Sequence, residues 1–172
     1  MKTFVPGLVL GLVVLPALVF VYVRSGRVPV ATAAPPFPLE RQLARMALHA
    51  RMSKEMPAQS PIPVTEPNLL AGARLYREHC AVCHGIAGAP QTAIAKGMFP
   101  RPPQLMRGKG VTDDPAAETY WKAANGIRLT GMPGFRQSFS DEQLWQMSQL
   151  LANADKLPQS VRDLMALPLP AE

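Results

Sequence analysis

The chain has 172 residues, of which 48% are apolar, 17% charged and 6% aromatic, and 19 are prolines. This composition is too apolar for a disordered protein and too rich in proline for a single compact body. The formal net charge is +6. Because no basic pattern interleaved with aromatic residues accompanies that charge, we expect no nucleic-acid partner.

Near the N-terminus, residues 4–23 form a stretch without a charged side chain. At about 1.5 Å per residue, such a helix spans a hydrocarbon core of roughly 30 Å. We therefore expect residues 1–27 to be a retained, single-pass membrane anchor that resembles an uncleaved signal. A cleaved signal peptide is the alternative, because Lys2 is basic and Ala31-Thr32-Ala33 is typical of a cleavage site. The apolar segments of such signals are shorter, however, at about 7–15 residues.

Residues 28–64 are predicted to be a linker that contains one helix. The parts before and after this helix are rich in proline, which favours extended backbone. Residues 39–56 consist of strong helix formers. We expect a solvated spacer helix. The alternative is that its basic side chains lie on anionic headgroups or on a partner subunit. The sequence assigns its apolar face to Leu39, Leu43, Met46, Ala47 and Ala50, with Leu48 and Met52 off that face, and its basic residues are Arg41, Arg45, Arg51 and Lys54.

Residues 65–172 are predicted to form a compact, all-α domain. One helix is expected over 68–79 and a weak one over 160–167. Another is expected to start at Thr112 or Asp113, with Pro115 in its first turn, and to end at Gly126. The fourth is expected from Ser140 to about Asn153. It begins with a capping box of Ser140 and Gln143 and a hydrophobic staple of Phe139 and Leu144. No alternating strand pattern is present.

The segment EHCAVCHG contains both cysteines of the chain, Cys80 and Cys83, followed directly by His84. Two cysteines cannot complete a structural zinc site, and a thioredoxin-type pair would need strands nearby. A plain disulfide is a further alternative. The pattern Cys-x-x-Cys-His is typical of covalent haem c attachment. Positions i and i+3 share a helix face, so both thiols can reach one porphyrin while the imidazole of His84 faces the iron.

A second ligand to that iron is expected further along the chain, and Met132 is our prediction. Met132 lies between glycines and before Pro133, where irregular backbone can bring a thioether close to a flat ring. Met106 is the alternative. Met147 is expected to face outward from its helix, and Met165 lies near the end of the chain.

Four segments carry a resemblance to a known family, and together they cover about residues 66–168. They are GARLYREHCAVCHG, MFPRPPQL, YWKAANGIRLTGMPGF and SDEQLWQMSQLLANADKLP. The chain resembles class I c-type cytochromes, in particular the small, membrane-anchored, mono-haem bacterial type. The resemblance implies a small helical fold around one haem. It also implies that Gly72 and Tyr76 face the C-terminal helix, and that a carbonyl from residues 100–103 accepts the Nδ1 proton of His84.

His/Met ligation leaves the iron no open position, so the expected function is one-electron transfer in a respiratory chain rather than catalysis. A fixed electron-transfer subunit of a larger membrane oxidoreductase is the alternative, and a haem enzyme or gas sensor is a more distant one. Residues 96–136 carry seven basic and three acidic side chains. We therefore expect redox partners with an acidic docking surface: a terminal oxidase, a dehydrogenase or another cytochrome.

The family attaches its haem outside the cytoplasm. We therefore expect the haem domain in the periplasm, anchored to the inner (cytoplasmic) membrane. Arg24 and Arg27 conflict with this orientation, because basic residues beside a membrane span favour the cytoplasmic side.

Overall fold

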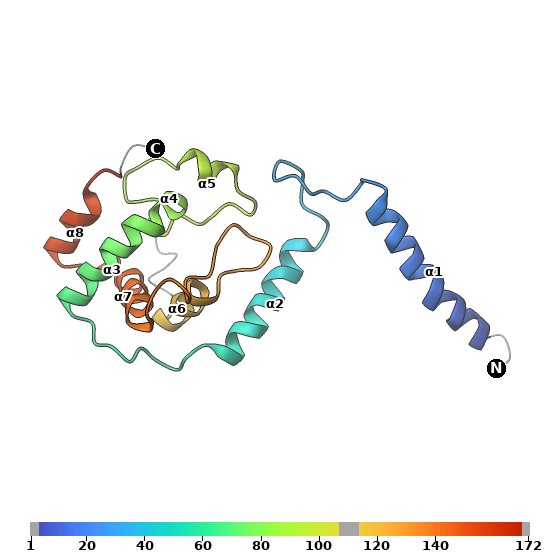
Figure 1. Ribbon diagram of the computed structural model, residues 1–172, viewed down its shortest axis with the longest axis horizontal. Coiled ribbons are helices and arrows are strands. Elements are labelled where there is room, and N and C mark those ends of the chain that lie inside the picture. Colours follow the sequence, from blue (N-terminus) through green and yellow to red (C-terminus); the bar gives the residue numbers. More distant parts are fainter. Residues whose placement is uncertain (1–3, 107–113, 170–172) are drawn as a thin grey trace. The chain divides into compact units, whose positions relative to one another are not determined.

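A computed structural model describes residues 4–106 and 114–169, and this part of the chain contains helices and no strand (Figure 1). The helices are α1 (Phe4–Arg24), α2 (Glu40–Glu55), α3 (Glu66–His79), α4 (Ala81–His84), α5 (Ala93–Gly97), α6 (Ala116–Asn125), α7 (Asp141–Ala152) and α8 (Gln159–Ala166). The all-α prediction is confirmed. The chain divides into two compact units, Met1–Leu43 and Ala44–Glu172.

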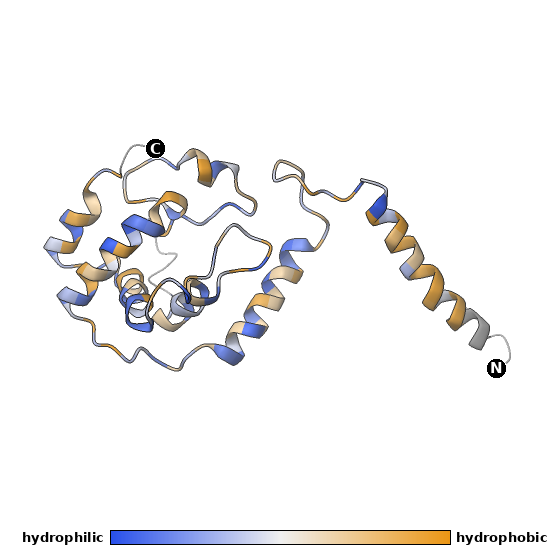
Figure 2. Cartoon of the chain, viewed as in Figure 1, coloured by the Kyte–Doolittle hydropathy of each residue, from blue (hydrophilic) through white to orange (hydrophobic). Residues whose placement is uncertain are grey.

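In the first unit, α1 forms over the predicted apolar stretch, and most of the helix is hydrophobic up to the basic last turn at Arg24 (Figure 2). Its large side chains are exposed, for example Leu12 at 67% and Leu15 at 66%. Among the described residues, no helix has both the length and the apolar character needed to cross a membrane. The predicted membrane-spanning helix is therefore not found in the structure.

The core of the second unit is built around α7. Helix α3 packs most extensively on α7, α6 packs on it as well, and α8 packs on α3. The crossing of α3 and α7 is close because Gly72 has no side chain. A Cβ there would lie 2.3 Å from the carbonyl oxygen of Gln146. The resemblance had placed Gly72 against the C-terminal helix, and the structure agrees.

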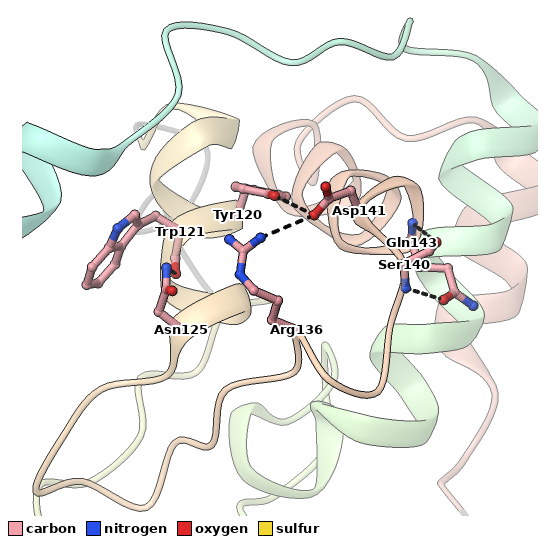
Figure 3. Close-up of polar contacts among 7 residues, drawn as sticks. All are labelled: Tyr120, Trp121, Asn125, Arg136, Ser140, Asp141 and Gln143. Atoms are coloured by element: carbon pink, nitrogen blue, oxygen red, sulfur yellow. Dashed lines mark hydrogen bonds and ion pairs between the residues drawn. The ribbon is translucent and has the colours of Figure 1, made fainter.

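The N-terminus of α7 has the predicted capping box. The Ser140 hydroxyl accepts from the Gln143 N–H at 3.2 Å, and the Gln143 amide oxygen accepts from the Ser140 N–H at 2.9 Å (Figure 3). The expectation that Met147 faces outward is wrong, because Met147 is only 2% exposed. Both α3 and α6 pack on α7. A side chain of α7 that does not face one of these two helices can therefore be buried by the other.

Helix α6 begins later than predicted. Pro115 is the residue before its first turn, and Gly126 ends it with φ +69°. The predicted caps Thr112 and Asp113 lie outside the described residues. The short helices α4 and α5 were not predicted. They span 4 and 5 residues, which is too short for a hydrophobic period to show.

Helix α2 is more than a solvated spacer. All of it from Ala44 onward belongs to the second compact unit, whereas the sequence placed the boundary at residue 65. Met52 is 4% exposed, and the indole N–H of Trp121 on α6 donates to the Glu55 carboxylate at 3.2 Å. Leu39, Leu43 and Met46, assigned to the apolar face, are exposed at 63%, 60% and 68%.

The face of α2 that packs inward is not the face that the sequence assigned as apolar. Leu48 is half-buried, Met52 is buried, and Met56 packs partly against the core. Their spacing of four residues places them on one side of the helix. The four basic side chains of α2 are exposed, as either interpretation of this helix requires.

Candidate haem-binding site

The two cysteines and the histidine lie on one helical turn where α3 passes into α4. Cys80 separates the two helices, and its carbonyl accepts from the N–H groups of Cys83 at 3.1 Å and His84 at 2.8 Å. Both thiols are free. The backbone therefore brings Cys80, Cys83 and His84 together with the spacing that the sequence predicted.

The two thiols differ in their surroundings. The Cys80 thiol donates to the thioether of Met147 on α7 at 3.1 Å. Burial, and to a smaller extent the nearby Cys83, raise the pKa of Cys80 to about 12, and burial also raises the pKa of Cys83. In the unmodified chain both groups are therefore neutral thiols at pH 7.

The imidazole of His84 is oriented by one backbone carbonyl. Its Nδ1 lies 2.8 Å from the Pro103 oxygen. A carbonyl can only accept, so Nδ1 carries the proton and Nε2 keeps a free lone pair. Burial lowers the pKa of His84, while the hydrogen bond to Pro103 opposes that shift. The acceptor expected somewhere in residues 100–103 is thus Pro103.

Two further bonds join this proline segment to the Cys-x-x-Cys-His turn. The N–H of Leu105 donates to the His84 carbonyl and the Gln104 amide donates to the Cys83 carbonyl, both at 3.2 Å. After the turn, Gly85 takes φ +71°, which favours glycine. A Cβ on Gly85 would lie 2.1 Å from Oε1 of Gln104. The backbone on both sides of the imidazole is therefore fixed.

Met132 lies in a loop that is closed by its own hydrogen bonds. The Met132 carbonyl accepts from the Ile127 N–H at 3.2 Å, and the Met132 N–H donates to the Thr130 hydroxyl at 3.1 Å. The same hydroxyl donates to the Ile127 carbonyl at 2.7 Å. The irregular backbone predicted for Met132 is present, and Met132 itself is half-buried.

The base of this loop is fixed to α6 and α7. A Cβ on Gly126 would lie 2.6 Å from the backbone nitrogen of Gly134. The two ends of the loop can therefore meet there only because residue 126 is a glycine. Further along, Arg136 lies 3.5 Å from the Asp141 carboxylate, which also accepts from the Tyr120 hydroxyl at 2.7 Å (Figure 3). The Met132 loop therefore leaves and rejoins the core at defined points.

The segment that holds His84 and the loop that carries Met132 come into contact at Met98, a residue whose place there was not predicted from the sequence. Met98 follows α5, and its terminal methyl lies 2.0 Å from where a Cβ of Gly131 would be. The signal available in the sequence was the glycine directly before Met132. The alternative ligand Met106 is half-buried against the core, and Met165 is buried at 6% exposure.

The donors present fit a covalently attached haem. Two thiols one turn apart can each form a thioether, and a neutral imidazole with a free Nε2 is the form that binds iron. The hydrogen bond from Nδ1 to a carbonyl is the arrangement typical of histidines that ligate metals. Within the described residues, no three His, Cys, Asp or Glu side chains gather as a metal site.

Comparison with known proteins supports the same class of protein. Residues 67–151 match the family model described as cytochrome c oxidase, cbb3-type, subunit III. This match supports a c-type cytochrome domain, and such a domain implies covalent haem c and electron transfer. No curated protein matches the chain.

One solved structure with similarity is the reducing HAO-like protein complex Kustc0457/Kustc0458 of Kuenenia stuttgartiensis. The aligned part is 26% identical with a TM-score of 0.48, and it covers 55% of this chain. It spans about half of the other chain, at 47%.

Proposed function

We propose that this protein is a one-electron carrier of the class I type with a single haem c. Cys80 and Cys83 would attach the haem by thioethers, and His84 and Met132 would be the two protein ligands of its iron. The observation that carries the proposal is the hydrogen bond of 2.8 Å from His84 Nδ1 to the Pro103 carbonyl. His84 follows two cysteines whose thiols are both free.

A haem held by His84 and Met132 would supply one-electron exchange with little rearrangement, and the two ligands would leave no position for a substrate. The chain's own residues supply the fixed geometry. Pro103 sets the imidazole tautomer, Tyr76 donates to the carbonyl of Gly85, and Met132 lies in a loop closed by its own hydrogen bonds. We therefore assign electron transfer rather than catalysis.

The ligand assignment is tested by replacing Met132 with Ala and recording the ferric spectrum. We expect the near-infrared band of sulfur-ligated haem to disappear, because the second ligand is removed. The matched control is Met106→Ala, which should keep the band. If the band survives in Met132→Ala and is lost in Met106→Ala, then Met106 is the ligand. Cys80→Ala together with Cys83→Ala should abolish covalent haem.

We further propose that α1 holds the protein at the inner membrane, with the haem domain in the periplasm. The support is the exposed apolar surface of α1 and the absence of charged residues over 4–23. Burying that surface in lipid removes it from water, which stabilises by about 25 cal/mol per Å². Redox proteins of the respiratory chain are the proposed partners.

A second candidate function is that of a fixed electron-transfer subunit in a membrane oxidoreductase. The family model that matches residues 67–151 is described as an oxidase subunit. In addition, α2 packs on the haem domain through Met52 and Glu55, which shortens the free linker between α1 and that domain. Purification in mild detergent distinguishes the two, because a subunit co-elutes with partners at fixed ratio and a carrier elutes alone.

A further inference from the structure

The side chain of Met98 lies directly on the residue that precedes Met132. Measured from the position that a Cβ of Gly131 would take, Cε of Met98 lies at 2.0 Å, Sδ at 3.5 Å and Cγ at 3.8 Å. The end of the side chain therefore makes the contact, and any side chain on Gly131 would displace it. Met98 itself is half-buried.

Met98 belongs to the part of the molecule that holds His84. It directly follows α5, whose N-cap Thr92 donates its hydroxyl proton to the Val82 carbonyl of α4 at 2.5 Å. Five residues beyond Met98, Pro103 accepts from His84. Met98 is thus fixed on both sides to the segment that carries the Cys-x-x-Cys-His turn.

The Met132 loop is closed by hydrogen bonds of its own. The loop's hydrogen bonds join Ile127, Thr130 and Met132 to one another, and its base is fixed at Gly126. Leu129, at the tip, is 93% exposed with φ +61°. The contact between Met98 and Gly131 connects this loop to the segment that holds His84.

We propose that Met98 is a positioning residue for the axial ligand Met132. This inference rests on the proposed function. The unbranched thioether of Met98 presses on Gly131 and limits outward movement of the loop, so that the sulfur of Met132 stays near the position of the iron. Shortening the Met98 side chain leaves an unfilled space beside Gly131. The Met132 loop then moves more freely, and a larger fraction of molecules lacks the sulfur ligand at any moment.

The length of the side chain is the property that matters. The contact is made by Cε, the last atom of an unbranched chain, and such chains fill irregular gaps well. Leucine has a similar volume but branches at Cγ and ends one atom earlier. Met98→Leu should therefore retain part of the effect, whereas Met98→Ala should lose it.

The test uses the full-length, haem-loaded protein and three measurements: the near-infrared sulfur band of the ferric form, carbon monoxide binding to the ferrous form, and the reduction potential. For Met98→Ala we expect a weaker band, several-fold faster carbon monoxide binding and a lower potential, with Met98→Leu between it and the parent. The matched control is Met165→Ala, because Met165 is a buried methionine of α8 that belongs to the core and is not a candidate ligand. It should lose stability without changing the three readouts.

A double-mutant cycle tests the contact itself. Gly131→Ala should weaken the band in the parent, because the new Cβ and the Met98 methyl cannot share the space. In the Met98→Ala background the same change should cost little, so the two effects should not add. Met98→Ala and Met98→Leu with parental band, carbon monoxide binding and potential would overturn the inference, and so would additive losses in the cycle. A parent protein without any sulfur band would instead contradict the His84/Met132 assignment.

Discussion

The phenol of Tyr76 is buried inside the turn that positions His84. Its hydroxyl donates to the Gly85 carbonyl at 2.7 Å, and the side chain is 0% exposed. Burial raises the pKa of Tyr76 well above its usual range, and the nearby Cys80 contributes in the same direction. The phenol therefore stays protonated in the folded protein, and it continues to donate at alkaline pH.

Replacing Tyr76 with Phe leaves the Gly85 carbonyl unsatisfied, and we expect a loss of about 1–3 kcal/mol in the free energy of unfolding at pH 8. The pH dependence gives a second check. The unfolded chain ionises this phenol near pH 10, while the folded chain keeps its proton. The folded state then binds more protons, so parental stability falls as the pH rises past about 10.

Urea unfolding of the haem-loaded protein between pH 8 and 11 measures both effects. The difference between parent and Tyr76→Phe should shrink above pH 10. The control is Tyr22→Phe, because Tyr22 on α1 is 38% exposed and belongs to the other compact unit, so its loss should change the free energy of unfolding by less than about 0.5 kcal/mol. A constant difference across this range would contradict the assignment to Tyr76.

At the residue scale, the spacing of residues along the chain predicted the part of the site whose members are close in sequence. Cys80, Cys83 and His84 are adjacent in sequence, and one turn of helix brings them together. Met98 was missed because its contact with Gly131 joins residues 33 positions apart. No periodic pattern in the sequence predicts such a contact, and a single methionine most often fills a gap in the hydrophobic core.

At the scale of elements, the ends of helices were easier to predict than their faces. The capping box of α7 depends on Ser140 and Gln143 alone, so the sequence was sufficient. The burial of Met147 depends on α3 and α6 covering two sides of the same helix. Which face of α2 packs inward likewise depends on α6, through Trp121. The apolar pattern of α2 alone predicted a different face.

The docking of α2 predicts a specific loss of stability. Met52→Ala removes a buried side chain, and large-to-small changes of this kind cost about 2–5 kcal/mol. Because α2 lies at the edge of the domain, where the cavity can relax, we expect the lower end of that range. Met46→Ala on the same helix is the control, since Met46 is 68% exposed and should change stability by less than about 0.5 kcal/mol.

Denaturant unfolding of the haem domain with α2 retained, followed by far-ultraviolet circular dichroism, measures this difference. The indole of Trp121 donates to Glu55, so loosening of α2 in Met52→Ala should also make Trp121 more accessible to solvent. Equal stability of Met52→Ala and Met46→Ala would show that α2 is a free spacer in solution.

At the scale of the whole molecule, the N-terminal region predicts where the protein is found. If α1 holds the protein at the membrane, deleting residues 1–27 and adding a cleavable export signal should yield a soluble, red periplasmic protein. The full-length chain should need detergent for extraction. A native N-terminus beginning at Ala34 would instead show that the segment is a removed signal.

The basic residues of 96–136 are not equally available to a partner. Lys122 lies 2.5 Å from the Glu118 carboxylate and 3.7 Å from that of Asp114, and Arg136 pairs with Asp141 at 3.5 Å. Lys109, part of the predicted docking surface, lies outside the described residues. Lys96, Arg101 and Arg128 are exposed and make no ion pair among the described residues.

These three exposed cations flank the two segments that carry the site, since Lys96 and Arg101 lie on either side of Met98 and Arg128 lies in the Met132 loop. An acidic partner would be steered toward the place where the electron leaves, and salt screens such steering over about 8–10 Å. Reversing all three to Glu should slow electron transfer several-fold at low ionic strength, with the difference shrinking as salt is added. The control reverses three exposed cations elsewhere in the same compact unit, Arg45, Arg74 and Lys156, and changes the net charge equally. If both triple variants slow transfer to the same extent, net charge alone acts and the cations around the site form no docking surface.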